Sequence, residues 1–150
     1  MKKIIITIAS VLITSLSIAQ WNKTIVKNGF DDPYKICYTN TDNNAVLKLE
    51  NTDISISFYL QGNYYCEDKP IVDILFLVNN KWIKYKIEAT KSRDNKVLFF
   101  TDNIEEENYF IDFLNATSVK IRVNETYCNR DIYQFNMYGS TSAFKFIKNE

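Results

Sequence analysis

Hydrophobic and polar residues alternate along several short segments of this chain, which is typical of β-strands with one buried face. The clearest case is 54–61, where Ile, Ile, Phe and Leu occupy every second position. A polar connection follows at 62–70, and 71–78 is then almost wholly apolar, as expected of a strand covered on both faces. We expect two neighbouring core strands here, with Cys66 at the bend between them.

Further short segments with strand patterns are separated by turn residues. Asn79 and Asn80 predict a tight hairpin, because Asn tolerates positive φ. The additional strands are expected at 35–38, 46–49, 82–88, 97–101, 118–124 and 132–138. Seven or more short strands predict a β-sandwich or an open barrel, and we prefer a mostly antiparallel sandwich.

Two segments have the spacing of helices. In the central one, 105–114, Asp102 can act as the N-cap and Glu105 completes a capping-box pattern. The acidic run at its start suits the helix dipole, although a metal or partner site is an alternative. A short C-terminal helix is expected at 140–147, with Ala143, Phe144 and Ile147 on one face.

The first 19 residues have the features of a secretory signal. Two lysines precede an apolar run at 4–18, and Ala19 is a small residue at the expected cleavage point. A membrane anchor is the alternative, but the run is shorter than the roughly 20 residues that a spanning helix needs. We therefore expect an exported protein, periplasmic or secreted, with 20–150 as a single domain and no membrane span. The segment 20–33 is expected to be loosely placed, docking at most one side chain.

The three cysteines suggest one disulfide, because exported proteins meet oxidising conditions. We favour Cys66 with Cys128, since both lie in polar surroundings at strand ends. Closing that loop would stabilise the fold by about 4 kcal/mol in the chain-entropy model. Cys37 lies within a strand pattern and is expected to be a buried thiol. A bond that involves Cys37, or no bond at all, remains open.

The chain contains no histidine, which removes the commonest general base and the Ser-His-Asp, Cys-His and histidine–zinc arrangements. With 18 basic and 18 acidic residues, nothing favours nucleic acid as a partner. We predict no catalytic residue, cofactor or metal. The segment 40–51 begins like an EF-hand loop but lacks its Gly and its final Glu. Asp73, within an apolar strand, could have a raised pKa and act as an acid, or could reach water at an edge.

Tyrosines cluster before Cys66 and next to Cys128, and tyrosine-rich surfaces suit contact with proteins or glycans. The candidate binding residues are Tyr59, Tyr64, Tyr65 and Tyr127. If the disulfide forms, these side chains would gather around it, or they could simply cover a sheet edge. A basic row on outward strand faces is more typical of a solvated surface; it consists of Lys84, Lys86, Lys120 and Arg122.

The order of elements in the second half resembles a known group of proteins. A strand pair precedes the capped helix, a small-residue step Asn115-Ala116-Thr117, and the basic strand 119–123. The chain closes with 135–143, in which Gly139 begins the last helix. This pattern, over about 54–147, is similar to small exported β-sandwich proteins of the invasion-associated locus B and VasI (type VI secretion-associated) kind. The resemblance implies an exported, non-enzymatic accessory protein without established catalytic residues. The terminal cysteine of that group is missing here, which puts a shared disulfide in doubt.

These observations favour an exported binding or accessory protein that acts through surface contacts in the cell envelope, with a protein or glycan partner. The first alternative is a periplasmic inhibitor of a cell-wall hydrolase such as lysozyme, with 62–70 as the blocking loop. The second is a hydrolase that uses carboxylates alone, which would need a second carboxylate facing Asp73 in a cleft.

Overall fold

The computed structural model describes residues 21–27, 29, 32–41, 44–51, 56–62, 64–101, 104–126, 128 and 131–149. The predicted signal segment 1–19 lies outside these ranges. So do Asp102, expected as a helix cap, and Tyr127, a candidate binding residue.

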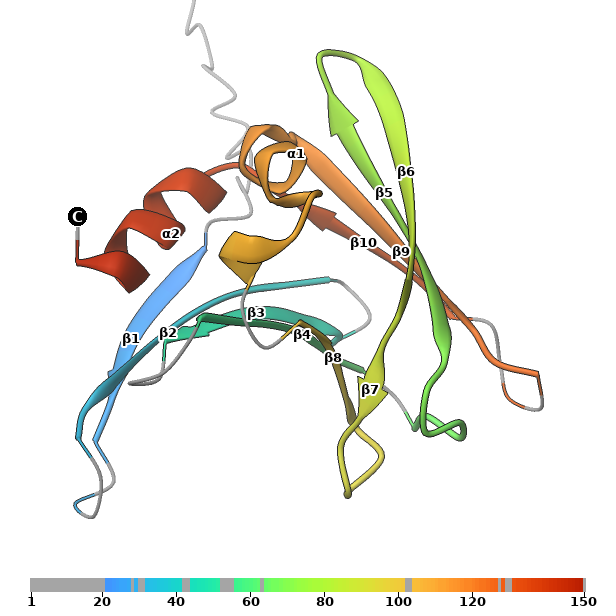
Figure 1. Ribbon diagram of the computed structural model, residues 1–150. Coiled ribbons are helices and arrows are strands. Elements are labelled where there is room, and N and C mark those ends of the chain that lie inside the picture. Colours follow the sequence, from blue (N-terminus) through green and yellow to red (C-terminus); the bar gives the residue numbers. More distant parts are fainter. Residues whose placement is uncertain are drawn as a thin grey trace, which may run out of the picture.

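Two antiparallel sheets make up most of the described chain, and the expected β-sandwich is confirmed (Figure 1). Among the described strands neither sheet closes into a barrel. The six-stranded sheet has the order β1 (Asn22–Val26), β2 (Tyr34–Asn40), β3 (Val46–Asn51), β4 (Ile56–Gln61), β8 (Val97–Thr101) and β7 (Thr90–Lys91). The four-stranded sheet has the order β10 (Ile132–Asn136), β9 (Ser118–Asn124), β5 (Ile71–Val78) and β6 (Lys81–Glu88).

The two strands expected to be neighbours lie in different sheets, so that expectation was wrong. β4 pairs with β3 and β8, whereas β5 pairs with β6 and β9. Both strands are interior, which is why both are rich in apolar residues. The connection 62–70 therefore carries the chain from one layer of the sandwich to the other.

The β5–β6 hairpin follows the sequence expectation. Asn79 and Asn80 have φ angles of 49° and 62° and join Val78 to its partner Lys81. After β6 the chain passes through the fully buried Ala89 and enters the other sheet as β7. The sequence had not predicted β7 or β1, because each is short or mostly exposed.

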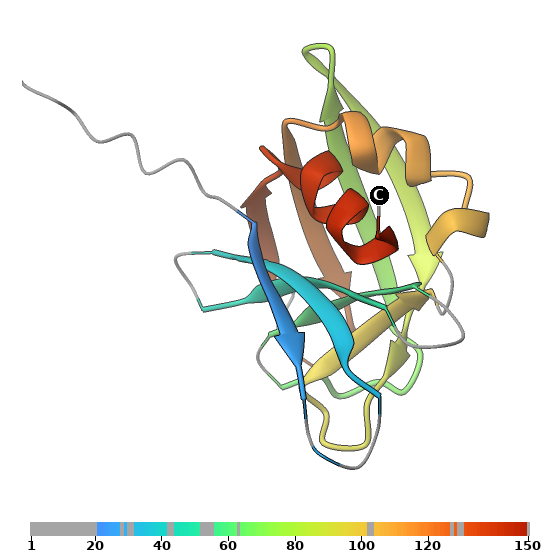
Figure 2. The same cartoon turned by 90° about the vertical axis from the view of Figure 1, so that its left-hand side faces the viewer.

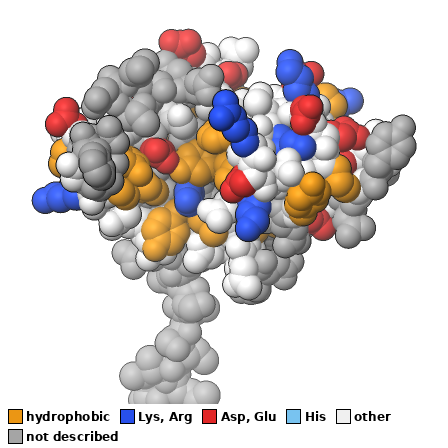
Figure 3. Space-filling view, turned by 90° about the horizontal axis from the view of Figure 1, so that it is seen from below, with side chains coloured by type: hydrophobic (Ala, Val, Ile, Leu, Met, Phe, Trp, Pro, Cys, Tyr) orange, Lys and Arg blue, Asp and Glu red, His pale blue; other side chains and the backbone are white. Residues whose placement is uncertain are grey.

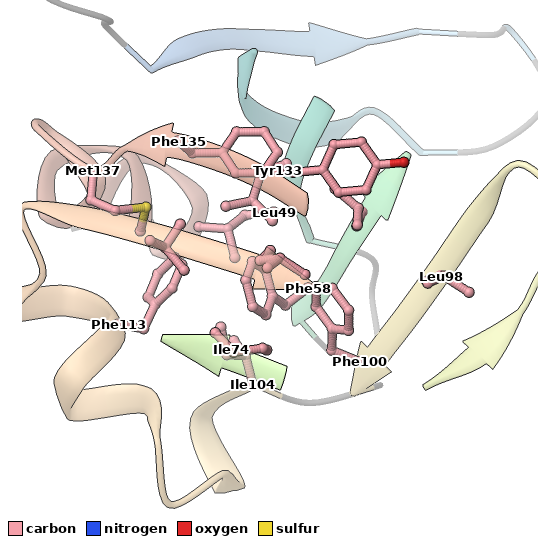
Figure 4. Packing of buried hydrophobic residues seen from close by; sticks show 14 of the residues in the cluster. Leu49, Phe58, Ile74, Leu98, Phe100, Ile104, Phe113, Tyr133, Phe135 and Met137 are labelled. Carbon is pink, nitrogen blue, oxygen red and sulfur yellow. The ribbon is translucent and has the colours of Figure 1, made fainter. Parts of the chain in front are cut away.

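The core between the sheets is filled by side chains from alternating strand positions and from the helices (Figure 4). Phe113 lies at the centre, with its ring 5.0 Å from that of Phe58 and 6.3 Å from that of Phe76. Trp21 packs edge-on against the same ring at 6.2 Å and is buried. The expected docking of one side chain from 20–33 is thus observed, although β1 is a paired strand and not a loose segment.

Two helical regions lie on one side of the sandwich, between the sheets (Figure 2). The expected central helix is split into a 3-10 turn, η1 (Ile104–Glu106), and a short helix, α1 (Phe110–Asn115). The expectation of one continuous helix was therefore wrong, and the expected cap Asp102 lies outside the described residues. Tyr109 and Phe113, which lie within the expected segment 105–114, are buried. The C-terminal helix α2 (Ser140–Lys148) is confirmed and packs on β2 and β3.

Candidate functional site

A disulfide joins the connection between β4 and β5 to the segment between β9 and β10. It links Cys66 with Cys128, the pairing favoured from the sequence, with Cα atoms 6.2 Å apart. Cys37 is free and buried, and its thiol donates to the carbonyl oxygen of Ala143 at 3.4 Å. Burial raises the pKa of the Cys37 thiol to about 11, so this thiol is protonated and inert at neutral pH.

We call the connection from Gly62 through Tyr64–Pro70 the bridged loop, and a buried carboxylate ties it to the end of β9. Glu125 is buried, and its Oε1 accepts the backbone N–H groups of Cys66 at 2.7 Å and Glu67 at 2.9 Å. Glu67 reciprocates, because its Oε1 accepts the N–H of Thr126 at 2.5 Å. Hydrogen bonding from Thr126, with its backbone N–H first, lowers the pKa of the Glu67 carboxyl.

Lys91 also holds the bridged loop in place, through contacts with Cys66 and Asp68. Its Nζ donates to the carbonyl oxygen of Cys66 at 3.0 Å and lies 3.2 Å from Oδ1 of Asp68. Its backbone N–H donates to the carbonyl oxygen of Asp68 at 3.0 Å, and that of Ala89 donates to Pro70 at 3.0 Å. A segment without regular secondary structure is therefore fixed at almost every residue that the structure describes.

The first part of the bridged loop is held by packing. Tyr65 is 1% exposed, and its backbone N–H donates to the carbonyl oxygen of Asn95 at 2.8 Å. Burial, followed by the neighbouring Tyr133, raises the pKa of the Tyr65 phenol. The Tyr65 ring occupies the space beside Gly62, where a Cβ atom would overlap its hydroxyl group. Glycine is thus required at position 62 by close approach and not by an unusual φ angle.

The structure does not bring the candidate tyrosines together as one exposed patch. Tyr64 is 63% exposed and accepts a hydrogen bond from Nδ2 of Asn95 at 3.1 Å. Tyr65 is in the core, and Tyr59 is buried on the outer face of β4, where its hydroxyl donates to Glu50. On that face, hydrophobic and charged side chains are interspersed (Figure 3). Only Tyr64 among the described candidates is available for contact.

Asp73 lies on the outer face of the four-stranded sheet, directly opposite Arg122 of β9 and Lys86 of β6. Arg122 donates to Oδ2 of Asp73 through Nε at 3.1 Å and also through Nη2. Asn124 Nδ2 donates to the same oxygen at 3.1 Å, and Lys84 Nζ lies 3.2 Å from Oδ1.

These donors decide the chemistry of Asp73. The bonds from Arg122 and the other donors outweigh burial and lower the pKa of the Asp73 carboxyl to about 2. The raised pKa considered from the sequence is therefore wrong. Asp73 also does not reach water at a sheet edge, because it is 3% exposed on an interior strand. A carboxylate this acidic is a poor proton donor and a weak base near neutral pH.

An open depression of about 510 Å³ lies over this cluster and reaches the bridged loop. Its lining combines three cations, two carboxylates, two neutral polar residues and one apolar residue: Lys84, Lys86, Arg122, Asp73, Glu125, Asn124, Thr126 and Ile71. Glu125 and Thr126 line the depression and also hold the loop, so the two features form one continuous surface. Beyond the depression, Lys120 lies 4.8 Å from the centre of the Trp82 ring.

Sequence reasoning missed Glu125 and Lys91, which organise the bridged loop. Glu125 directly follows a predicted strand and lies three positions before Cys128, which is the only signal that could have found it. Lys91 begins a charged and polar segment, and no local pattern indicates that it reaches Cys66. Among the described residues, the one group with metal-ligand atoms close together is Cys66, Glu125 and Cys128, where both sulfurs are already joined in the disulfide.

Comparison with known proteins supports the fold. No family model matches the chain, and no curated protein matches its sequence. Among solved structures, the crystal structure of invasion associated protein B from Bartonella henselae superposes with a TM-score of 0.51 and 14% sequence identity. The match covers 85% of this chain and 92% of that protein. The resemblance to the invasion-associated locus B kind, expected from the order of elements, is therefore confirmed at the level of the fold.

Proposed function

We propose that this chain is an exported, non-enzymatic binding domain, and that the bridged loop with the adjoining depression is its contact surface. The proposal rests on one observation: an irregular loop at the surface is held in place by a disulfide, by the buried carboxylate of Glu125 and by Lys91. A loop held in one conformation loses little entropy when it binds a partner. Proteins place recognition residues on such loops for this reason.

Exposed side chains on the bridged loop supply the contacts. Tyr64 presents a large amphipathic ring, and the Asp68 and Lys69 side chains are 94% and 68% exposed. The hydrogen bond from Asn95 restrains the Tyr64 side chain, so less conformational entropy is lost when its ring binds a partner. The partner is a protein or a glycan of the cell envelope.

Export is supported by the signal pattern at 1–19 and by the disulfide, which fits an oxidising compartment. The fold likeness to invasion associated protein B agrees with an accessory role. The low pKa and multiple donors of Asp73 argue against its use as the acid of a carboxylate hydrolase, which agrees with a non-enzymatic role. Within the described ranges, none of the helices has the length and apolar character needed to cross a membrane.

Site-specific photo-cross-linking in the native cell tests this proposal. A photoreactive residue at position 64 or 69 should give a discrete adduct, and one at Lys145 on exposed α2 should give none. Replacing Tyr64 with Ala while the probe is at 69 should weaken the adduct. Absence of an adduct from either loop position, or equal adducts from position 145, would contradict the proposal.

The inhibitor alternative rests on the same loop, because a fixed protruding segment can block an enzyme cleft. Purified cell-wall hydrolases assayed with the wild-type protein and the Tyr64→Ala variant decide this point. If the wild-type protein lowers hydrolase activity and the Tyr64→Ala variant does not, the inhibitor role is supported. If no hydrolase of the panel is affected, only the accessory role remains.

A further inference from the structure

The depression on the outer face of the four-stranded sheet has an unbalanced charge. Asp73 pairs with both Lys84 and Arg122, so these three groups together retain one positive charge. With Lys86 and Glu125 included, the lining as a whole carries one net positive charge. Lys86, on the neighbouring strand, makes no hydrogen bond or ion pair with any residue that the structure describes. Lys86 and Arg122 flank Asp73 from the two neighbouring strands, and the ammonium group of Lys86, unpaired among the described residues, attracts an anion to its side of the depression.

The same lining limits what kind of anion fits. Arg122 uses Nε and Nη2 on Asp73, which leaves Nη1 for an incoming acceptor. Two carboxylates in the lining, those of Asp73 and Glu125, oppose a ligand with closely spaced negative charges. Their oxygens can accept hydrogen bonds from hydroxyl groups instead.

The uncharged residues match a sugar ring. Asn124 and Thr126 offer an amide and a hydroxyl group, which pair with ring substituents as donor or acceptor. Ile71 supplies a small apolar surface for the C–H face of a ring. The depression therefore combines one anion subsite with several hydroxyl subsites.

We propose that this depression binds an acidic sugar residue of an anionic glycan, with its carboxylate held by the unpaired Lys86 and with Nη1 of Arg122 as a further donor. This deepens the proposed binding role, on which it rests, by naming the ligand class of one part of the surface. The bridged loop then lies beside the bound chain, since Glu125 and Thr126 line the depression and hydrogen-bond to the loop.

Binding of oligogalacturonate to the full mature protein tests the inference, measured by calorimetry at low and moderate salt. The methyl-esterified oligomer, which keeps the hydroxyl groups and lacks the charge, is the matched ligand control. Lys86→Gln should weaken binding about tenfold or more, because a charged hydrogen bond is lost. Lys120→Gln removes the same charge on the same sheet face outside the depression, and should change affinity less than about twofold.

Four outcomes would overturn the inference: no binding of oligogalacturonate, equal binding of its ester, equal effects of the two lysine variants, or tighter binding of polyphosphate or polyglutamate. Circular dichroism of each variant confirms that a lost affinity does not reflect unfolding. The proposed function is judged separately, because cross-linking from position 64 does not require Lys86. If the Lys86→Gln variant keeps its cross-linked adducts and the protein does not bind the glycan, the proposed binding role is supported. That result would exclude only the acidic sugar as its ligand.

Discussion

The carboxylate of Glu125 accepts the backbone N–H of Cys66 at 2.7 Å, so the disulfide is reinforced by a hydrogen bond between the same two segments. The N–H of Glu67 shares this oxygen. A covalent link fixes one point of a loop. Two hydrogen bonds from consecutive backbone N–H groups also fix the direction in which the backbone runs. The bridged loop therefore owes its conformation to both.

Replacing Glu125 with Ala should loosen the bridged loop. Two part-buried N–H groups would lose their acceptor, at a cost of about 1–3 kcal/mol. Hydrogen exchange at the amides of Cys66 and Glu67 should become faster, while the disulfide remains intact. Glu125→Gln keeps an acceptor oxygen and is the matched control, with a smaller change expected. Unchanged exchange in the Ala variant would show that the disulfide alone orders the loop.

Gly62→Ala should destabilise the protein by about 1–3 kcal/mol, because the new methyl group would overlap the Tyr65 hydroxyl. It would also lie 2.9 Å from the Tyr133 hydroxyl, so relief by side-chain movement is restricted. Chemical denaturation measures the loss. The Tyr65→Phe background removes the closest atom and should recover part of the stability. An equal penalty in both backgrounds would contradict this steric explanation.

Asp73 should make stability depend on acidity at low pH. Its pKa is lowered from about 3.8 to about 2, so the folded state favours the ionised carboxylate. The contribution is fully present above about pH 4 and is lost as the pH falls towards 2. Asp73→Asn should therefore reduce stability at pH 7 by about 1–2 kcal/mol, and the difference from wild type should shrink below pH 4. Denaturation midpoints at pH 7, 4 and 2.5 measure this, and a constant difference would contradict it.

Thiol counting should distinguish the three cysteines. The native protein should react with no equivalent of a thiol reagent, since Cys37 is fully buried with a pKa of about 11. Unfolding without reductant should expose one thiol, and unfolding with reductant should expose three. Cys37→Ala should remove the single thiol released by unfolding. Rapid labelling of the native protein would contradict the buried position of Cys37 or the disulfide.

The sequence by itself determined most strands, the antiparallel β class and the C-terminal helix. Period-two patterns such as that of 118–124 depend on local side-chain direction, and the structure reproduces β9 with the same bounds. The Asn79-Asn80 turn was equally local, because positive φ is a property of the residues themselves.

Only the tertiary structure decided which strands are neighbours and what each polar group meets. β4 and β5 are adjacent in sequence and lie in opposite layers, since pairing depends on long-range contacts that no local pattern records. Asp73 became strongly acidic because β9 brings Arg122 beside it across 49 positions of sequence. Glu125 and Lys91 likewise acquire their roles from segments distant in the chain, so electrostatics and loop order emerge only when the two sheets are assembled.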